Sequence, residues 1–514
     1  MSNYLDIKSL IDSDYYKTNS RIRWHVNHLQ YDKFTKDLYS WLNSIELSKE
    51  EKEIFDISSV FIYTELASYL THVYDFIYLT ERNLSPIYSN QSNVFIDKIW
   101  NKEVIKTSLL IELEKNRLRV NKLKQLYSLL VKIFPKKYVQ TVHVSSNDLV
   151  EQYLNGTKGI TLKIIPHYYF EINIKSSTFS KVLSTKVRDI LVKEIESSYF
   201  ILNDDHIESI GFILDSYIAR SYNNMNSYNE FLSGFNKNVS IITGTGNSYY
   251  NRLLSSILKK EDLEVIRFNH GGERCFYNDK HFWENGDLFQ TDIYVTYGKK
   301  WKIWLEKIVK YSGKKITIKS ISSDHHNKIY KKFFNKTKQK NNKILYIPNS
   351  FKGEFRIMPY TSLIDPILFD WQKYLIELLQ KNGFEVIYKT HPKGFLHNEN
   401  ILGKIANYES TKPMIEALEE ADTVLCDYAG SAFIESMCAG KNIVLVDTMQ
   451  RPFDKNNKKD LQEAVKIVDA FWEDNILKVD EEELVDALNN FEINKENMRK
   501  VVNDYFLSTE NYVN

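Results

Sequence analysis

Cysteine, proline and glycine are all scarce in this sequence. Its 514 residues include 3 cysteines, 9 prolines and 17 glycines. The cysteines, Cys275, Cys426 and Cys438, form no CxxC pair, and three are too few to cross-link a chain of this length. A disulfide-rich secreted protein is therefore excluded. We interpret the cysteines as reduced thiols and expect a cytoplasmic protein.

An excess of charge of either sign is also missing. Lysine and arginine number 68 against 67 aspartate and glutamate residues, which leaves a net charge of +1. Such a chain has no overall field that attracts DNA or RNA, so we expect no nucleic-acid partner. Any site for an anion must be local.

Long uninterrupted apolar runs are absent as well. The most apolar early stretch, residues 57–79, contains Glu65, His72 and Asp75, which a membrane-spanning helix tolerates poorly. We therefore expect a buried helix there and no transmembrane segment. The first ten residues also lack the basic and apolar regions of a signal peptide. Peripheral association with the inner face of a membrane stays open.

What the sequence does contain is typical of a folded protein with several cores. Hydrophobic residues make up 43% and charged residues 26%, and the length suggests roughly two to four packing units. In the N-terminal part, apolar residues recur at the spacing of a helix. Strands alternating with helices follow, which predicts an α/β fold with doubly wound parallel sheets. We divide the chain into a helical N-terminal region (1–136), a first Rossmann-like domain (137–312), a linker (313–342), a second Rossmann-like domain (343–480) and a helical tail (481–514).

A small-residue turn, Gly244-Thr-Gly-Asn247-Ser, lies between an expected strand, 239–243, and an expected helix, 249–260. Backbone N–H groups at such a turn can face an anion. Gly244 and Asn247 are therefore candidates for nucleotide binding. The third glycine of a dinucleotide fingerprint is missing, so a plain tight turn is an equally good interpretation.

The next expected strand, 264–268, ends at Asn269-His-Gly-Gly-Glu273. Two titratable side chains, His270 and Glu273, flank glycines that leave room for a substrate, which suits acid–base chemistry. The alternative is a structural turn with a hydrogen-bonded histidine. The predicted catalytic residues are Glu273, His270 and Asp279, with Glu284 and Asp287 as weaker candidates.

In the second α/β block, the strand 385–389 leads into Thr390-His-Pro-Lys-Gly394. Proline fixes the backbone after the histidine and holds the imidazole at a strand end, where a phosphate could meet it. We predict that His391, Pro392 and Lys393 bind a nucleotide donor. A purely structural turn is the alternative.

The strand 423–426 is followed by Asp427-Tyr-Ala-Gly-Ser-Ala, which opens a helix. Small residues let a ligand approach the backbone, and the free N–H groups of a first helical turn attract phosphate. Gly430 and Ser431 are therefore predicted donor-binding residues, and Glu435 could accept hydrogen bonds from ribose hydroxyls. The alternative is that Ser431 only caps the helix.

Metal ligands at the usual spacing are not evident. His325-His326 lacks partners, and no Asp-x-Asp follows a strand in the second half. We expect no metal and no cofactor.

The order HGGE, KTHPKG and CDYAGSAFIESMCAGKNIVLVD resembles that of GT-B-fold glycosyltransferases of bacterial surface-polysaccharide synthesis. In particular it is similar to enzymes that use CMP-activated acidic sugars such as Kdo and nonulosonic acids. The resemblance covers residues 239–447. It implies that His391 and Pro392 contact the CMP phosphate, that Gly430-Ser431 completes the phosphate site and that Glu273 is the catalytic carboxylate. The usual acidic pair is absent around His270, and the usual paired serines are replaced by Gly430-Ser431.

The expected function is therefore transfer of a sugar, with a CMP-activated acidic sugar favoured, to a glycan or glycoconjugate acceptor of a capsule or lipopolysaccharide. The nucleotide-sugar is a co-substrate. One alternative is a polyol-phosphate transferase that uses CDP-glycerol, since such enzymes share a similar motif order. Another is a non-catalytic nucleotide-binding subunit of a polysaccharide assembly complex.

Overall fold

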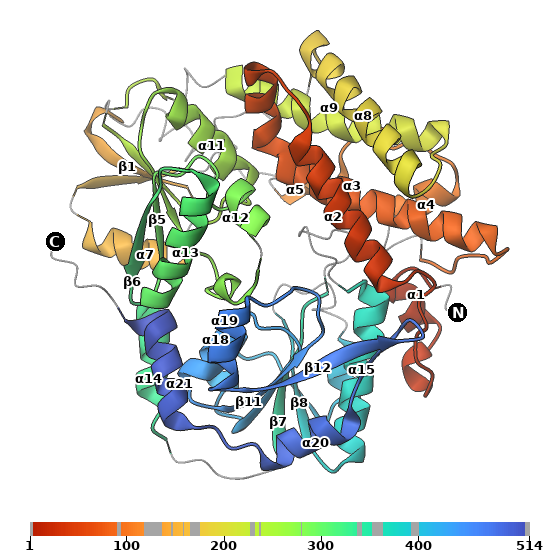
Figure 1. Ribbon diagram of the computed structural model, residues 1–514, viewed down its shortest axis with the longest axis vertical. Helices are drawn as coiled ribbons and strands as arrows, with labels where there is room; N and C mark the ends of the chain where they lie inside the picture. Colours follow the sequence, from red (N-terminus) through yellow and green to blue (C-terminus); the bar gives the residue numbers. More distant parts are fainter. Residues whose placement is uncertain are drawn as a thin grey trace.

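The chain folds into two α/β units and a helical N-terminal region (Figure 1). The computed structural model describes residues 4–89, 94–117, 136–144, 147–157, 159–164, 175–226, 232–235, 238–278, 280–336, 342–351, 363–391 and 400–508. The N-terminal helices are α1 (Ile7–Asp12), α2 (His28–Ser44), α3 (Lys49–Glu81), α4 (Val94–Trp100) and α5 (Leu109–Arg117).

Helix α3 begins at a capping box and continues for 33 residues. The Ser48 hydroxyl accepts from the N–H of Glu51, and the Glu51 carboxylate accepts from the N–H of Ser48, which satisfies two donors at the helix start. The polar residues in its middle find partners inside the protein, since Glu65 accepts from the Ser108 hydroxyl and the Leu109 N–H. Within the described ranges, no helix is long and apolar enough to cross a membrane.

Among the described residues, the first α/β unit is a six-stranded sheet in the order β2-β1-β3-β4-β5-β6, with all neighbours parallel. The central strands are almost wholly buried, as in a parallel sheet covered on both faces. The strands are β1 (Val139–His143), β2 (Ile160–Lys163), β3 (Ser240–Thr243), β4 (Val265–Phe268), β5 (Ile293–Tyr297) and β6 (Thr317–Ile321). The helices are α7 (Asp148–Gly156), α8 (Thr178–Ser198), α9 (Asp204–Asn226), α11 (Tyr249–Lys260), α12 (Lys280–Asn285), α13 (Lys299–Ser312) and α14 (Asp324–Phe333).

Helices α8 and α9 lie against α2 and α3, far along the sequence from them (Figure 1). The Tyr217 hydroxyl of α9 donates to Glu65 of α3 at 2.8 Å. The rings of Phe34 on α2 and Tyr199 after α8 meet edge to face at 4.9 Å. The helical part of the molecule is thus built from two separate stretches of chain.

The segment 313–342, predicted to be a linker, belongs largely to the first unit. It contains β6, which pairs in parallel with β5, and helix α14. In β6 the side chains of Ile318 and Ser320 are buried and alternate with more exposed ones. A strand at the edge of a sheet can keep lysines on its outer face. The Lys-rich composition of this stretch therefore resembled that of a surface linker, although its residues alternate as in a strand. The prediction of a linker was wrong for this stretch.

The second α/β unit is a seven-stranded sheet of described residues in the order β13-β12-β11-β10-β7-β8-β9. Its neighbours are parallel except β12 and β13, which pair antiparallel. The strands are β7 (Lys343–Ile347), β8 (Glu385–Lys389), β9 (Tyr408–Ser410), β10 (Thr423–Cys426), β11 (Asn442–Asp447), β12 (Lys466–Glu473) and β13 (Ile476–Val479). The helices are α15 (Asp365–Lys381), α16 (Ile401–Ile405), α17 (Met414–Ala417), α18 (Ser431–Cys438), α19 (Lys455–Gln462), α20 (Glu481–Asn490) and α21 (Lys495–Val502).

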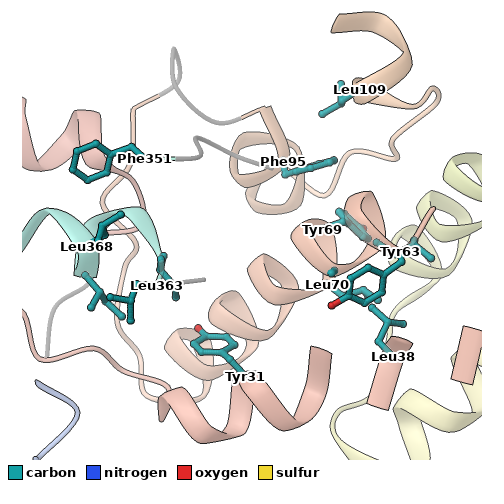
Figure 2. Packing of buried hydrophobic residues seen from close by; sticks show 14 of the residues in the cluster. Tyr31, Leu38, Tyr63, Tyr69, Leu70, Phe95, Leu109, Phe351, Leu363 and Leu368 are labelled. Carbon is teal, nitrogen blue, oxygen red and sulfur yellow. The ribbon is translucent and has the colours of Figure 1, made fainter. Parts of the chain in front are cut away.

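The helical N-terminal region also packs on the second unit. Figure 2 shows one buried cluster that joins them, with Tyr69 from α3 and with Phe351 and Leu368 from the second unit. Close by, the Arg21 Nε donates to the Asp370 carboxylate of α15 at 2.8 Å. The N-terminal region therefore touches both α/β units and helps to fix their relative position.

The C-terminal segment returns to the first unit. After α21, the π-helical turn η5 (Asn503–Leu507) lies against α13 and β5. The Phe506 carbonyl accepts from the N–H of Ser323 at 3.3 Å. Gly298 makes room for this turn, because a Cβ there would lie 2.3 Å from the carbonyl carbon of Tyr505. The end of the chain thus ties the two units together.

Candidate functional site

The two α/β units meet at the carboxyl ends of their strands. The N–H of Asn278, after β4, donates to the Pro452 carbonyl, after β11, at 2.8 Å. The N–H of Asp454 donates back to the Phe276 carbonyl at 2.8 Å. Ligands of open α/β sheets bind at this edge. The candidate site therefore consists of the two facing sheet edges.

The loop after β4 carries two of the predicted catalytic residues. His270 is exposed and Glu273 is half-buried. Between them, Gly271 has a φ of +92° and Gly272 a φ of +82°, values that favour glycine. A Cβ on Gly271 would lie 2.3 Å from the Oε2 of Glu273, and a Cβ on Gly272 would lie 3.2 Å from the Cδ1 of Ile434 on α18. Gly271 thus leaves room for the Glu273 carboxylate beside the loop, and Gly272 lets the loop approach α18 of the second unit.

The Oε2 atom of Glu273 is buried, and no described residue forms a hydrogen bond with it. Leaving a buried polar atom unpaired costs free energy, so this oxygen is suited to accept a proton or hydrogen bond from a substrate. Tyr297 stands nearby at the end of β5. Burial first, and then the charges of Asp148, Glu273 and Glu435, raise the pKa of Tyr297, which keeps its hydroxyl protonated.

Asp287 is fully buried and joins the two turns of the first edge. Its carboxylate accepts from Arg274 Nη1, from the Thr245 hydroxyl and from the N–H of Gly246, each at 2.8 Å. Burial works to raise the pKa of Asp287, but Arg274, Thr245 and Arg267 outweigh it and lower that pKa below its usual value. Asp287 therefore stays ionised, which suits a structural role better than the weak catalytic one that the sequence suggested.

The turn with Gly244 and Asn247 lies in the first unit, at the end of β3. A Cβ on Gly246 would lie 2.2 Å from the Gly286 carbonyl oxygen, so the turn is tightly closed on that side. The Thr245 hydroxyl also accepts from the N–H of Asn247 at 3.0 Å. The structure therefore places these two predicted nucleotide-binding residues on the first sheet, whereas His391 and Ser431 lie on the second.

In the second unit, α18 begins directly after the short turn that follows β10. Gly430 is its N-cap and makes no side-chain capping hydrogen bond, while Ser431 is exposed as the first helical residue. The first N–H groups of a helix have no partner within the helix. Ser431 is thus not the cap, and the start of α18 offers free backbone donors at the sheet edge.

Glu435 is half-buried and faces the first unit. Its Oε1 lies 3.3 Å from the Nε2 of His325 on α14. The hydrogen bond that His325 donates to Glu435 raises the pKa of His325, whereas burial lowers the pKa of the neighbouring His326 to about 3. The sequence drew attention to His325-His326 only as a possible metal-binding pair that lacks further ligands. The structure gives Glu435 a protein partner that no sequence signal indicated.

Three side chains that the sequence did not indicate form the contact between the edges. Arg451 lies with its guanidinium 3.9 Å from the ring centre of Tyr277 and donates from Nη1 to the Tyr428 hydroxyl at 2.5 Å. The rings of Tyr277 and Tyr428 stack at 5.9 Å. Together with Thr448 and Gln450 they line a cavity of about 10 Å³, room for about one water. The one feature of the sequence that could have indicated Arg451, Tyr277 and Tyr428 is their position just after expected strands or motifs.

Asp427, the first residue after β10, holds the second edge together. Its carboxylate accepts from the Tyr346 hydroxyl at 2.7 Å and from the N–H of Asn349 at 2.5 Å. Burial raises the pKa of Asp427 to about 6. This aspartate ties β10 to β7 and to the turn after β7.

His391 is exposed at the end of β8, which is separated from β10 only by β7. The turn before it is held by Thr390, whose hydroxyl donates to Glu409 at 2.6 Å and accepts from the Asn400 amide at 2.7 Å. His391 and Ser431 therefore lie on the same edge of the second sheet. Three other predicted site residues fall outside the described residues, namely Asp279, Pro392 and Lys393.

In the part of the chain that the structure describes, no group of three or more His, Cys, Asp or Glu side chains could hold a metal ion.

Comparisons with known proteins give only distant similarity. No family model matches the chain, and no curated protein matches its sequence. A structure from Listeria monocytogenes, assigned as a UDP-N-acetylglucosamine 2-epimerase, is 12% identical with a TM-score of 0.37, over 72% of this chain and 92% of that one. The Arabidopsis thaliana UGT89C1 complexed with UDP is 12% identical with a TM-score of 0.34, over 74% and 90%.

The fold class is clear from the chain's own topology. Two α/β units with largely parallel sheets face each other at their carboxyl edges, and a helical region precedes them. This is a GT-B-like architecture, as the motif order predicts. Fold alone does not specify the chemistry.

Proposed function

We propose that this protein is a glycosyltransferase that takes a sugar from a nucleotide-activated donor. The observation that carries the proposal is the start of α18, where Gly430 gives no side-chain cap and Ser431 is exposed. The backbone donors and dipole of such a helix start favour a phosphate group. The loop with Glu273 approaches this helix from the other unit through the Gly272 contact with Ile434.

The donor diphosphate or monophosphate would lie on the second unit. Ser431 and the first-turn N–H groups of α18 would hold its oxygens, and His391 would reach the same group from the end of β8. The sheet order supports this arrangement, because β8 and β10 flank β7. Pro392 and Lys393 directly follow His391 in the sequence and are proposed for the same role.

Glu273 is proposed as the catalytic carboxylate. It would take the proton of an acceptor hydroxyl as that oxygen forms a bond to the anomeric carbon. The bond from this carbon to the donor phosphate oxygen breaks, and the nucleotide leaves with the electron pair. The support is the Oε2 atom that has no partner at the facing edges. His270 and Asp279 are the neighbouring candidates for this proton transfer.

The donor that we favour is a CMP-activated acidic sugar, Kdo or a nonulosonic acid, and the acceptor a surface glycan or glycoconjugate at the inner face of the membrane. The order HGGE, KTHPKG and CDYAGS supports this choice. Transfer of a polyol phosphate from CDP-glycerol needs a similar phosphate site. A non-catalytic nucleotide-binding subunit would keep the site and lose the reaction.

Release of nucleotide from a panel of CMP-, CDP-, UDP- and GDP-activated donors separates these functions. We expect CMP release from CMP-sugars, and CMP to raise the melting temperature more than UDP, GDP or NAD does. Ligand at a hundred times its Kd stabilises a protein by about 2.7 kcal/mol. CMP release from CDP-glycerol supports the polyol-phosphate alternative, and binding without release supports the non-catalytic one. A shift with NAD and none with cytidine nucleotides would overturn the donor assignment.

A further inference from the structure

A fully buried arginine near the end of β4 has no complete set of partners. Arg267 is 0% exposed. Its Nη2 donates to the Ser255 hydroxyl on α11 at 2.8 Å, but its Nε and Nη1 have no acceptor among the described residues. A buried guanidinium normally uses its donors, because each one left unpaired costs free energy. The described residues therefore leave Arg267 without a complete set of acceptors.

The turn after β3 lies directly over this guanidinium. A Cβ on Gly246 would lie 2.3 Å from the Nη1 of Arg267, so only the absence of a side chain leaves them this close. The same turn begins α11, whose N-cap, Ser248, makes no side-chain capping hydrogen bond. The amide oxygen and nitrogen of Asn247 are buried and also lack partners within the described ranges of the chain. Thr245, Asn247 and Ser248 are half-buried, so the turn is reached from solvent.

The buried charges around this turn do not cancel. Arg252, Arg267 and Arg274 are buried near a single fully buried carboxylate, that of Asp287. Arg274 pairs directly with Asp287, whereas Arg252 donates to backbone carbonyls, including that of Asn285. Three further carboxylates nearby, Asp56, Glu273 and Glu284, are only half-buried, and the half-buried Lys314 adds another cation. Only the fully buried groups of the described residues, three arginines against Asp287, carry an excess of positive charge under the turn.

We infer that the turn Gly244–Ser248 is a second anion site, which binds a phosphate or carboxylate group of the sugar acceptor. The start of α11 supplies backbone donors and its dipole, Asn247 supplies an amide, and Arg267 supplies a fixed charge beneath Gly246. That the anion belongs to an acceptor rests on the proposed function, because the donor site is placed on the second unit. The anion site itself does not depend on it.

A purely structural turn explains only part of these observations. The hydrogen bond from Gly246 to Asp287 closes the turn on one side. It leaves the Nη1 of Arg267 and the amide of Asn247 without partners among the described residues. An anion over the turn would accept from the Asn247 amide and would balance the charge of Arg267 beneath it.

The test uses the full chain and follows the melting temperature with sodium phosphate, sodium acetate and sodium chloride at equal ionic strength. CMP is held at a saturating concentration so that the donor site is filled. We expect phosphate or acetate to raise the melting temperature more than chloride does, and the larger of the two shifts to indicate which anion the site prefers. Equal shifts with all three salts would overturn the inference.

Two variants locate the effect. Arg267→Met keeps the length of the side chain and removes its charge. Asn247→Leu removes an amide that has no partner in the described part of the chain, so its own folding cost should be small. Each should weaken binding of the anion about tenfold or more, the usual result of losing a charge-assisted hydrogen bond. Retention of the full shift in a folded Asn247→Leu protein would show a structural turn.

Ser431→Ala serves as the matched control at the other helix start. It should reduce the shift with CMP and keep the shift with phosphate. If wild-type protein shows no shift with CMP, the donor assignment fails, and the phosphate series is then read without CMP. The two proposals can therefore fail separately.

Discussion

One buried aspartate lies at each of the two facing sheet edges, and the two differ in their hydrogen-bond partners. Asp287 in the first unit is bound by a guanidinium, a hydroxyl and a backbone N–H. Asp427 in the second unit accepts from the Tyr346 hydroxyl and the N–H of Asn349, both neutral. Both side chains are buried.

The pKa shifts of these aspartates go in opposite directions. Burial alone favours the neutral form of a carboxyl group. Arg274 and its neighbours overcome burial at Asp287 and lower its pKa. Neutral donors do not overcome it at Asp427, whose pKa rises to about 6. The nature of the partner, rather than the depth of burial, decides the charge that each edge carries.

This difference separates the expected roles of the two edges. At the first edge, the ionised Asp287 joins the loop with Thr245 to the loop with Arg274. The second edge is a turn of small residues that opens into a helix, next to Asp427 with its raised pKa of about 6. The first suits catalysis and the second suits the binding of a phosphate.

The largest effect is expected from Glu273→Gln in the first edge. Gln keeps the size of the side chain and removes the ionisable group, so turnover should fall by roughly a hundred- to ten-thousandfold. Donor binding, measured by the shift in melting temperature with CMP, should change little. Asp148→Asn is the control, because Asp148 also lies near Tyr297 and is exposed. Normal turnover in Glu273→Gln, with activity lost in His270→Ala or Asp279→Asn, would assign the role to that neighbour.

A smaller effect, on stability, is expected from Asp287→Asn. The change breaks a buried ion pair and leaves Arg274 without its carboxylate, which typically costs about 3 to 5 kcal/mol of unfolding free energy. Urea unfolding measures it. Asp427→Asn is the matched change in the second edge and should cost clearly less, because its partners are neutral. Equal losses would remove the contrast between the two edges.

The pH dependence of stability should come from the second edge. A raised pKa means that folding favours the protonated form, so the contribution of Asp427 is full below about pH 4 and is lost as pH rises through about 6. Two pKa units correspond to about 3 kcal/mol at most. In Asp427→Asn this part of the slope should disappear. Asp287→Asn should leave this part of the slope in place, and the opposite result would reverse the assignment.

The strands that the sequence predicted best are short, apolar and followed by small residues, as in 239–243 and 423–426. These patterns are local, so they are visible without the fold. The strands that it missed, β6, β9 and the β12–β13 hairpin, mix charged residues with apolar ones. Strands at or near the end of a sheet bury only part of their surface, so their composition resembles that of a loop.

Candidate site residues were predicted where a motif follows a strand, because the topology brings such residues to one edge. The partners of these residues could not be predicted in this way. Arg451 meets Tyr277 from 174 positions away, and Glu435 meets His325 from 110 positions away. Such pairs depend on how the two units are packed, which no local pattern encodes.

The start of α18 and the start of α11 offer a matched pair of serines. Ser431→Ala should weaken binding of CMP about tenfold, since a hydrogen bond to a charged group contributes about 1.5 to 3 kcal/mol. His391→Ala should have a similar effect. Ser248→Ala, at the start of α11, should leave CMP binding unchanged. Calorimetric titration with CMP measures all three, and equal weakening by both serine changes would mean that the donor site is not specific to the second edge.

The smallest effect is expected at the pair that links the two units. Glu435 raises the pKa of His325, so the contribution of the pair is full below the usual histidine pKa of about 6.5 and is lost as pH rises through the raised value. His325 is about a third exposed, and solvent screening limits such pairs to about 0 to 1 kcal/mol. His325→Gln should therefore lower stability slightly at pH 5.5 and hardly at all at pH 8.5, measured by urea unfolding at both values. Lys332→Gln is the control, because it removes an exposed ion pair, with Glu419, that contains no histidine. An equal loss at both pH values would show that His325 contributes packing rather than charge.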